Sequence, residues 1–290
     1  MLRLCTLKKV FSYKNALGKT DDKIAVDNLN LQINNNEIFG LLGPNGAGKT
    51  TTIRMLTMLT KPTSGKIYYD NLTTDENPKN IKGLIGVVPQ HINFDQDLTI
   101  GENMHLHGRL HHMTKQARVS RINELLSYVE LSDRINDSVR SLSGGMQRRL
   151  LIVRALMHKP SILFLDEPTV ALDPQVRRRI WDLIRKMHQL GVTIVLTTHY
   201  IEEAESLCGR VAIMNRGKLI ALDSPDNLKE KIGQYVVEWD NDNAERNFKI
   251  FQNKKAAQTF AAQLQQSNIL QRRSNLEDVF VELTGKKVNN

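Results

Sequence analysis

The sequence is poor in cysteine and in long apolar runs. Cys5 and Cys208 are the two cysteines among its 290 residues, and no Cys/His metal spacing surrounds either one. Two thiols are too few for a disulfide framework, which favours a reducing compartment such as the cytosol. The longest apolar stretches, such as 162–165 and 192–196, are much shorter than the 18–20 or so residues of a membrane-spanning helix. Residues 1–5 also lack the apolar run of a secretory signal. We therefore expect a chain that does not cross a membrane by itself.

The net charge is moderately positive, and the basic residues are not concentrated in one segment. Lys and Arg number 40 against 31 Asp and Glu, a formal charge of +9, and the basic residues are spread along the chain. We interpret the local bunches at 148–149 and 177–179 as solvated helix faces. Apolar residues at 40% and charged residues at 24% are typical of a soluble domain with a core. The length allows one large domain, or one domain with a smaller appendage.

The periodicity of apolar residues predicts an α/β protein. Strands are expected within 2–42, with the polar stretch 14–23 as a surface loop, and residues 97–158 carry helical patterns. Two continuous apolar runs at 162–165 and 193–196 flank a helical stretch at 174–190. Strand–helix–strand order with doubly buried strands implies a parallel sheet covered on both faces.

The end of the chain is more polar. Residues 240–243 predict a loop, and a helix is expected at 275–284, where Leu276, Val279, Phe280 and Leu283 fall on one face. The segment 240–265 indicates no chemistry.

A phosphate-binding loop is the first chemical motif. Residues 43–50 read Gly43-Pro44-Asn45-Gly46-Ala47-Gly48-Lys49-Thr50, between a predicted buried strand and a predicted helix. Glycines let successive backbone N–H groups point at an anion, and the helix N-terminus adds about half a positive charge. Lys49 supplies a cation for the β- and γ-phosphates, and the Thr50 hydroxyl can bind Mg²⁺.

A pair of carboxylates follows a second buried strand. Asp166 and Glu167 come directly after the run 162–165, at the strand end where open α/β sheets bind ligands. Asp166 suits a metal ion, directly or through water, and Glu167 suits the activation of an attacking water.

A second anion-binding turn opens a later helix. Ser143 can cap this helix, and Gly144 and Gly145 leave its first N–H groups accessible. This turn has no lysine of its own. A simple explanation is that two copies face each other, with each nucleotide between one phosphate loop and the other copy's turn.

These motifs, in this order, resemble the ATP-binding subunits of ABC transporters over about residues 2–230. The resemblance implies the ABC type of P-loop NTPase fold, with a mostly parallel core sheet, an antiparallel β subdomain and a helical subdomain at about 91–158. It implies an ATP-binding domain at 1–230 and a small extension at 235–290 that ends in an amphipathic helix.

The resemblance also implies roles for single residues. Residues 43–50 and Thr51 hold ATP, and Thr50, Gln90 and Asp166 bind Mg²⁺. Lys49, Glu167 and His199 are the catalytic residues. The family signature is matched by Ser143, Gly144, Gly145 and Met146, which contact the partner's ATP, and Asp173 lies in the loop that crosses the dimer interface. Val170 departs from the family, where many relatives carry Ser. For the aromatic platform under adenine, both Phe11 and Tyr13 are candidates.

The family branch is suggested by the residues after the signature, 146–150, and by the ending 275–285. Both resemble exporters of drugs, lipids or polysaccharides whose membrane half is a separate protein. We therefore expect an ATP- and Mg²⁺-dependent ATPase that pairs with a second copy or a related subunit. It would bind a separate membrane permease at the cytoplasmic face of the inner membrane, without a nucleic-acid partner. The alternatives are a soluble ABC ATPase that acts on nucleic acid or ribosomes, and an importer subunit.

Overall fold

The computed structural model describes all residues except 15–17, 19, 242–244, 265–267 and 286–290. Its centre is a six-stranded sheet in the order β10-β9-β3-β8-β7-β6. Five neighbouring strands are parallel, and β10 pairs antiparallel with β9. The strands of this sheet are β3 (Ile38–Leu42), β6 (Ile85–Val88), β7 (Ile162–Asp166), β8 (Thr193–Thr198), β9 (Arg210–Asn215) and β10 (Lys218–Asp223). The predicted mostly parallel core sheet is confirmed.

Alternate residues of the central strands enter two different cores. Leu163 and Leu165 of β7 join a core with helices on one face, whereas Phe164 joins the core on the other face. The period of two along a strand explains this division. Because both faces are covered, these strands are continuous apolar runs in the sequence.

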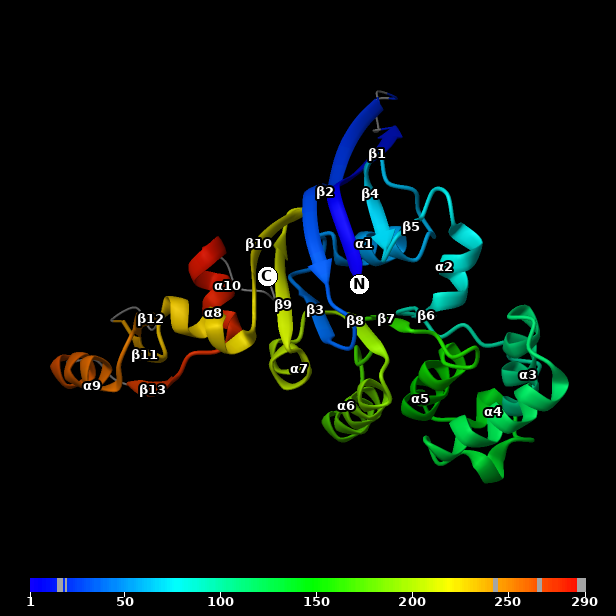
Figure 1. Ribbon diagram of the computed structural model, residues 1–290. Helices are drawn as coiled ribbons and strands as arrows, with labels where there is room; N and C mark the ends of the chain where they lie inside the picture. The colour runs from blue at the N-terminus through cyan, green and yellow to red at the C-terminus, as the bar shows by residue number, and fades with distance from the viewer. Residues whose placement is uncertain (15–17, 19, 242–244, 265–267, 286–290) are drawn as a thin grey trace.

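An antiparallel sheet covers one face of the core sheet, and it lies above that sheet in Figure 1. Its strand order is β2-β1-β4-β5. The strands are β1 (Leu2–Lys14), β2 (Thr20–Ile33), β4 (Ser64–Tyr69) and β5 (Leu72–Thr73). This is the expected antiparallel β subdomain.

The predicted surface loop at 14–23 is wrong in its extent. Residues 20–23 belong to β2, where Thr20 pairs with Lys14 and Lys23 with Phe11. Residues 15–17 and 19 of this stretch lie outside the described residues. Both faces of the hairpin tip are exposed, so its polar residues show no apolar alternation that would have indicated strands.

Helices cover the sheet and form the insert that the sequence predicts. The helices are α1 (Lys49–Leu56), α2 (Pro78–Leu84), α3 (Ile100–Leu110), α4 (Lys115–Ser127), α5 (Gly144–Ala155), α6 (Pro174–Gln189), α7 (Ile201–Leu207), α8 (Pro225–Ile232), α9 (Lys254–Gln263) and α10 (Leu276–Thr284). Short 3₁₀ turns lie at Ser132–Arg134 and Val139–Ser141. Helices α3, α4 and α5 group together to one side of the core sheet in Figure 1. Among the described residues, no helix is long and apolar enough to cross a membrane.

A third, small sheet follows α8. It has the order β12-β11-β13 and consists of β11 (Tyr235–Asp240), β12 (Arg246–Phe251) and β13 (Leu270–Arg273). Val237, Ala257 and Ala261 form a separate small core between this sheet and α9. In contrast, Leu276, Val279 and Phe280 of α10 join the large core of the main body. Figure 1 shows the small sheet and α9 at one end of the molecule, with α10 beside α8.

Candidate functional site

The loop between β3 and α1 has a backbone that requires glycine at two places. Gly48 has φ 104°, and a Cβ there would lie 2.5 Å from the carbonyl oxygen of Ala25. At Gly43 a Cβ would lie 2.3 Å from the carbonyl oxygen of Met214. Larger residues at either position would therefore displace the loop from the neighbouring backbone. The predicted Gly-rich turn from a buried strand into a helix is confirmed.

A cavity of about 370 Å³ opens over this loop. It is lined by Phe11, Lys23, Ala25, Asn45, Gly46, Ala47, Gly48, Lys49, Thr50, Thr51, Gln90 and Glu167. The lining combines backbone N–H groups at a helix start with the ammonium groups of Lys23 and Lys49, which suits an anion such as a phosphate chain. Phe11 is among the lining residues and Tyr13 is not. The structure therefore favours Phe11 as the aromatic side chain of this cavity.

Lys49 is the buried cation of the cavity. Its Nζ donates to the carbonyl oxygens of Gly43 at 2.7 Å and Pro44 at 3.1 Å. The Oε1 of Glu167 lies 3.6 Å from the same Nζ. Burial lowers the pKa of Lys49 from its ordinary value, and the negative charges of Glu167 and Asp166 oppose this effect.

The Asp166 carboxylate, at the end of β7, accepts hydrogen bonds from two hydroxyl groups. Its Oδ1 accepts from the Thr50 hydroxyl at 3.0 Å and from the Thr197 hydroxyl at 2.6 Å. Thr50 is in the first turn of α1, and Thr197 is on the neighbouring strand β8. The carboxylate and the Thr50 hydroxyl thus offer adjacent oxygen ligands of the kind that Mg²⁺ prefers.

Glu167 has a left-handed backbone, with φ 48°. This conformation is uncommon for a residue with a side chain, and contacts to β8 hold it. The Glu167 N–H donates to the Thr197 hydroxyl at 3.0 Å and to the Thr197 carbonyl at 3.2 Å. The turn places the Glu167 carboxylate near residues that follow β6 and β8.

Two further predicted residues converge on the Glu167 carboxylate. The Gln90 side-chain amide donates to Oε2 at 3.3 Å, and Nδ1 of His199 lies 3.3 Å from Oε1. Gln90 follows β6 and His199 follows β8, so the two strands that flank β7 in the sheet supply the side chains. An amide, an imidazole and an ammonium group therefore surround one carboxylate.

Arg148 of α5 supports the segment that carries Gln90. Its guanidinium donates to the carbonyl oxygens of Pro89 at 2.9 Å and Gln90 at 2.6 Å. The interpretation of residues 148–149 as a solvated face is wrong, because Arg148 is only 4% exposed and Arg149 donates to the Val129 carbonyl. In the second bunch, Arg178 and Arg179 are exposed, whereas Arg177 is partly buried against the Tyr200 ring.

The predicted signature turn does not line the cavity. Ser143 caps α5 as predicted, accepting from the Met146 N–H at 3.4 Å. Gly144 is open, with nothing within 4 Å of an added Cβ, whereas Gly145 packs against Val176 of α6. Asp173 caps α6 by accepting from the N–H groups of Gln175 and Val176. Lys49, Thr50, Gln90, Asp166, Glu167 and His199 are therefore linked by contacts, while residues 143–146 and Asp173 lie on other helix starts.

Sequence reasoning missed two supporting residues. Thr197 connects Asp166 and Glu167, and a threonine within an apolar strand gives little signal in the sequence. Glu203 is fully buried, and its Oε1 accepts from the Thr169 hydroxyl at 2.8 Å and the Trp181 indole N–H at 3.0 Å. Burial raises the pKa of Glu203. These bonds tie the segment just after Glu167 to α6 and α7.

Comparisons with known proteins agree with this arrangement. The sequence profile of a family described as "ABC transporter" matches residues 26–170. A Nod factor export ATP-binding protein I from Cupriavidus metallidurans is 38% identical, over 96% of this chain and 98% of that protein. The protein of the same name from Ralstonia nicotianae is 36% identical, over 96% of this chain and 95% of that protein.

Among solved structures, the chain is similar to the ATP-binding cassette MJ0796. A dimeric post-hydrolysis state of that cassette, bound to ADP and Pi, gives a TM-score of 0.67 at 32% identity, covering 77% of this chain and 98% of that one. The ATP-binding subunit of another ABC transporter gives a TM-score of 0.71 over 98% of this chain. At 21% identity, this second likeness shows the fold alone.

Proposed function

The chain belongs to the ABC transporter family, and from this premise we propose that it is the ATP-hydrolysing subunit of an exporter with a separate membrane-spanning part. The relatives that match it over nearly its whole length are named for export. The direction of transport follows from these names, and the ending at 275–285 that suggests the exporter branch agrees with them. The identity of the cargo depends on the membrane subunit.

ATP would place its phosphates over the loop at residues 43–51. The N–H groups of Gly46, Gly48 and the first turn of α1 would bind the anion, and Lys49 would exchange its two carbonyl partners for phosphate oxygens. Phe11 would stack on adenine, an interaction of about 1–3 kcal/mol. Its ring already lies 4.9 Å from the Lys9 ammonium, so a cation supports the same platform.

Mg²⁺ fits the oxygen donors beside this loop. The Thr50 hydroxyl and the Asp166 carboxylate are already 3.0 Å apart, and the Gln90 side chain lies across the cavity. These groups would hold the ion next to the phosphates. When bound, the ion would neutralise charge on the phosphate oxygens.

Glu167 is the residue we assign to the attacking water. Its carboxylate would accept a proton from, or orient, a water aimed at the γ-phosphate. The His199 imidazole, 3.3 Å from that carboxylate, would stabilise the developing charge together with Lys49. Donors that are already in place commonly contribute about 10²–10³-fold each to such a step.

The observation that carries the proposal is the separation of two anion-binding turns in one chain. The phosphate loop lines the cavity, whereas the capped turn of Ser143, Gly144 and Gly145 lies at the start of α5, outside its lining. We propose that a second copy, or a related subunit, supplies its own turn to this cavity. In that dimer Asp173 would lie in the loop that crosses the interface, and Met146 would contact the partner's nucleotide.

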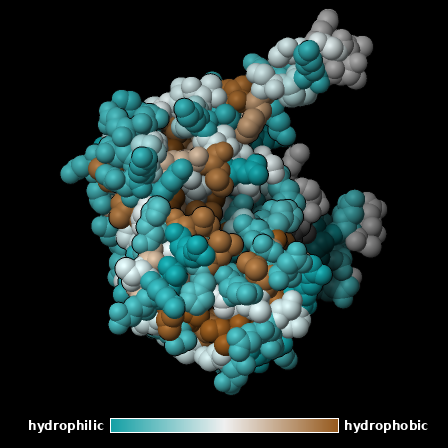
Figure 2. All heavy atoms as spheres, turned by 90° about the vertical axis from the view of Figure 1, so that its right-hand side faces the viewer, coloured by the Kyte–Doolittle hydropathy of each residue, from teal (hydrophilic) through white to brown (hydrophobic). Residues whose placement is uncertain are grey.

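The membrane subunit would bind on the side of the helical insert. Leu106 and Leu110 of α3 are exposed there by 43% and 68%. Figure 2 faces this side and shows apolar side chains in an interrupted band between polar ones. A hollow of about 330 Å³, lined in part by Met55, Met58 and Pro78, lies on α1 and α2. Lys61, Asp75 and Lys82 also line this hollow, so its lining is partly apolar and partly charged. A mixed hollow of this kind suits a short amphipathic helix of a partner, which would place the chain at the cytoplasmic face of the inner membrane.

Replacement of the proposed catalytic carboxylate tests this function. In Glu167→Gln, ATP hydrolysis should fall by at least 10³-fold because the amide cannot act as a base. Binding of ATP should persist, and the unhydrolysed nucleotide should hold the closed dimer. Phosphate release measures the first effect, and light scattering during size-exclusion chromatography with ATP and Mg²⁺ measures the second.

Glu202→Gln is the matched control, because Glu202 is exposed on α7. It should hydrolyse ATP as the unmodified chain does and form no lasting dimer. Normal hydrolysis by Glu167→Gln would remove Glu167 from the mechanism. A variant that stays monomeric with bound ATP would contradict the shared nucleotide site.

A further inference from the structure

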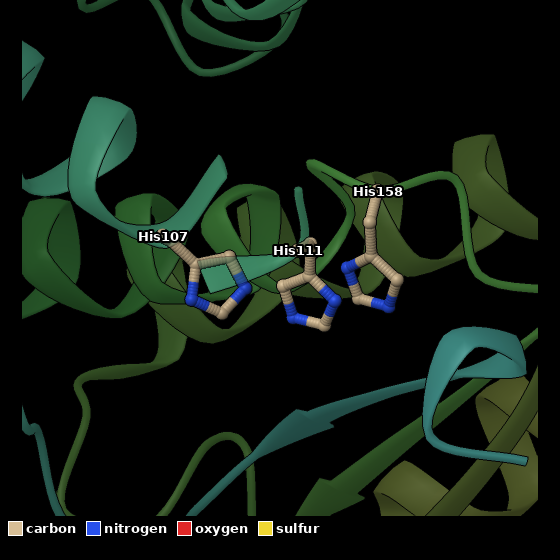
Figure 3. A group of neighbouring side chains, drawn as sticks. All are labelled: His107, His111 and His158. Atoms are coloured by element: carbon tan, nitrogen blue, oxygen red, sulfur yellow. The ribbon is translucent and has the colours of Figure 1, made fainter. Parts of the chain in front are cut away.

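Three histidines that the nucleotide site does not use lie together at the border of the helical insert (Figure 3). His107 is on α3, His111 follows the last turn of the same helix, and His158 comes after α5. His107 and His111 are four residues apart, which places them on one helix face. One ligand nitrogen from each ring can be chosen so that all three lie within 4.8 Å of one another.

The hydrogen bond of His158 fixes which nitrogen is free. Its Nε2 lies 2.9 Å from the carbonyl oxygen of Ile85. A carbonyl can only accept, so Nε2 carries the proton and Nδ1 keeps its lone pair. In the described part of the chain, that Nδ1 is buried without a hydrogen-bond partner, and so is Nε2 of His107.

Such an arrangement is typical of metal-binding histidines. A ligating imidazole commonly donates its other N–H to a backbone carbonyl or a carboxylate, which orients the ring. Buried polar atoms without partners are uncommon, and two of them in one cluster call for a ligand. A metal ion would accept lone pairs from both.

The ligand atoms of the cluster decide which metal ions it can bind. His107 and His158 are partly buried, and each has one buried ring nitrogen without a hydrogen-bond partner in the described part of the chain. The nearby Arg154 and Arg121 guanidinium groups bear positive charge, and no carboxylate belongs to the cluster. Hard cations such as Mg²⁺ and Ca²⁺ require oxygen ligands. The candidates are therefore ions that bind imidazole nitrogen strongly, such as Zn²⁺, Ni²⁺ and Co²⁺.

We propose that His107, His111 and His158 bind one divalent transition-metal ion, with Zn²⁺ as the representative ligand. Three imidazoles and one water would complete a tetrahedral shell at about 2.0–2.1 Å from the ion. The rings of His111 and His158 stack with centroids 3.6 Å apart and an angle of 4°, so His111 must turn to aim its nitrogen at the shared ion. His111 is the chain's C-cap residue after α3 and is partly exposed, which gives the ring room for this turn.

The bound ion would connect two parts of the molecule. His107 and His111 belong to the first helix of the insert, and His158 is bonded to the first residue of β6. Strand β6 leads directly to Gln90 at the nucleotide cavity. The ion would therefore hold α3 against the strand that positions Gln90, and it would restrict movement of the insert relative to the sheet.

A cobalt titration of the full chain tests the site. The protein should carry no affinity tag and no nucleotide, and should be treated with a chelator beforehand, since polyhistidine and ATP both bind these ions. We expect one Co²⁺ per chain at micromolar concentrations, with visible absorption bands of tetrahedral cobalt that Zn²⁺ removes by competition. Binding of Zn²⁺ at a hundredfold excess over its Kd should also raise Tm by about 5 °C.

Two variants and a control locate the ion. His107→Gln and His158→Gln should each weaken Co²⁺ binding by at least tenfold, and Gln at 158 can still donate to the Ile85 carbonyl. His112→Asn should bind as the unmodified chain does, because His112 is exposed and adjacent to the cluster without belonging to it. Far-UV circular dichroism identifies which variants are folded. The proposal is overturned by the absence of saturable Co²⁺ and Zn²⁺ binding, or by undiminished binding in a folded His107→Gln or His158→Gln.

Discussion

Arg148 shows how a single buried charge can organise a site without entering it. Its guanidinium donates hydrogen bonds to two successive carbonyl groups, those of Pro89 and Gln90. Burial lowers its pKa, and the nearby charges of Asp166 and Glu203 oppose this effect. The bonds fix the backbone from which the Gln90 side chain reaches Glu167. Arg148 is therefore a positioning residue for Gln90.

Arg148→Met should preserve the aliphatic packing and remove both bonds. Two buried carbonyl groups then lose a charged partner, so the free energy of unfolding should fall by about 2–4 kcal/mol. The kcat for ATP should fall by about tenfold or more, with a smaller change in KM, because Gln90 is displaced while the phosphate loop remains.

Urea unfolding and steady-state phosphate release measure these two effects. Arg54→Met is the matched control on the exposed side of α1, and its stability should stay within about 0.5 kcal/mol of the unmodified chain. Equal stability of the two variants would contradict the role given to Arg148.

Single residues were predictable where their chemistry depends on neighbours in the sequence. Gly48 and Lys49 follow from the motif, because the loop conformation and the helix start are local. The burial of Arg148 was not predictable, since its partners lie about sixty residues away in the sequence. The same holds for Thr197, whose role depends on the neighbouring strand β7.

At the scale of elements, the two glycines at the start of α5 have different surroundings. Its capped turn leaves Gly144 open, whereas a Cβ on Gly145 would lie 2.5 Å from a methyl group of Val176 on α6. Gly145 thus allows α5 and α6 to approach closely, and Gly144 leaves space above the helix start. The two adjacent glycines are therefore favoured for different physical reasons.

A pair of alanine substitutions separates these reasons. Gly145→Ala should lower the free energy of unfolding by about 1–3 kcal/mol through overpacking against Val176. Gly144→Ala should leave it unchanged or raise it by up to about 1 kcal/mol, since alanine favours the helix. Thermal unfolding of the monomer without nucleotide measures both. The prediction fails if the two variants unfold at the same temperature.

The β1–β2 hairpin shows the limit of sequence patterns for elements. Core strands such as β7 and β8 were predicted because burial on both faces requires continuous apolar runs. The hairpin tip at 11–14 and 20–23 is exposed on both faces, and only pairing with its neighbour makes it a strand. Phe11 lines the nucleotide cavity from this hairpin and Tyr13 does not, so the pairing brings one of the two aromatic candidates to the cavity.

Across the whole molecule, the chain end returns to the main body. The small sheet β11–β13 has its own core with α9, whereas Phe280 on α10 is 1% exposed within the large core. Asp278 of α10 accepts from both terminal nitrogens of Arg272 at 2.7 and 2.8 Å, which joins the helix to β13. The division of the chain into an ATP-binding domain at 1–230 and an extension at 235–290 stays a prediction.

Truncation of one α10 side chain tests how far the main body depends on this helix. Phe280→Ala should destabilise the main body by about 3–5 kcal/mol, because a large ring leaves a cavity in the shared core. Leu283→Ala on the same helix is the control, since Leu283 is 44% exposed and should cost less than about 1 kcal/mol. Denaturant unfolding followed by ATP binding measures the effect. If Phe280→Ala costs no more than the control, α10 is dispensable for the nucleotide-binding body.

The sequence by itself determined the phosphate loop, the carboxylates after β7, the capped turn at Ser143 and the order β7–α6–β8 in the core. Each depends on local spacing: a glycine where the backbone turns, a cap where a helix begins, an apolar run where a strand is buried on both faces. Only the tertiary structure decided the burial of Arg148, the link through Thr197, the place of Phe11 in the cavity and the meeting of His107, His111 and His158. These depend on segments far apart in the chain, because side chains from different elements become neighbours only when the helices and sheets pack.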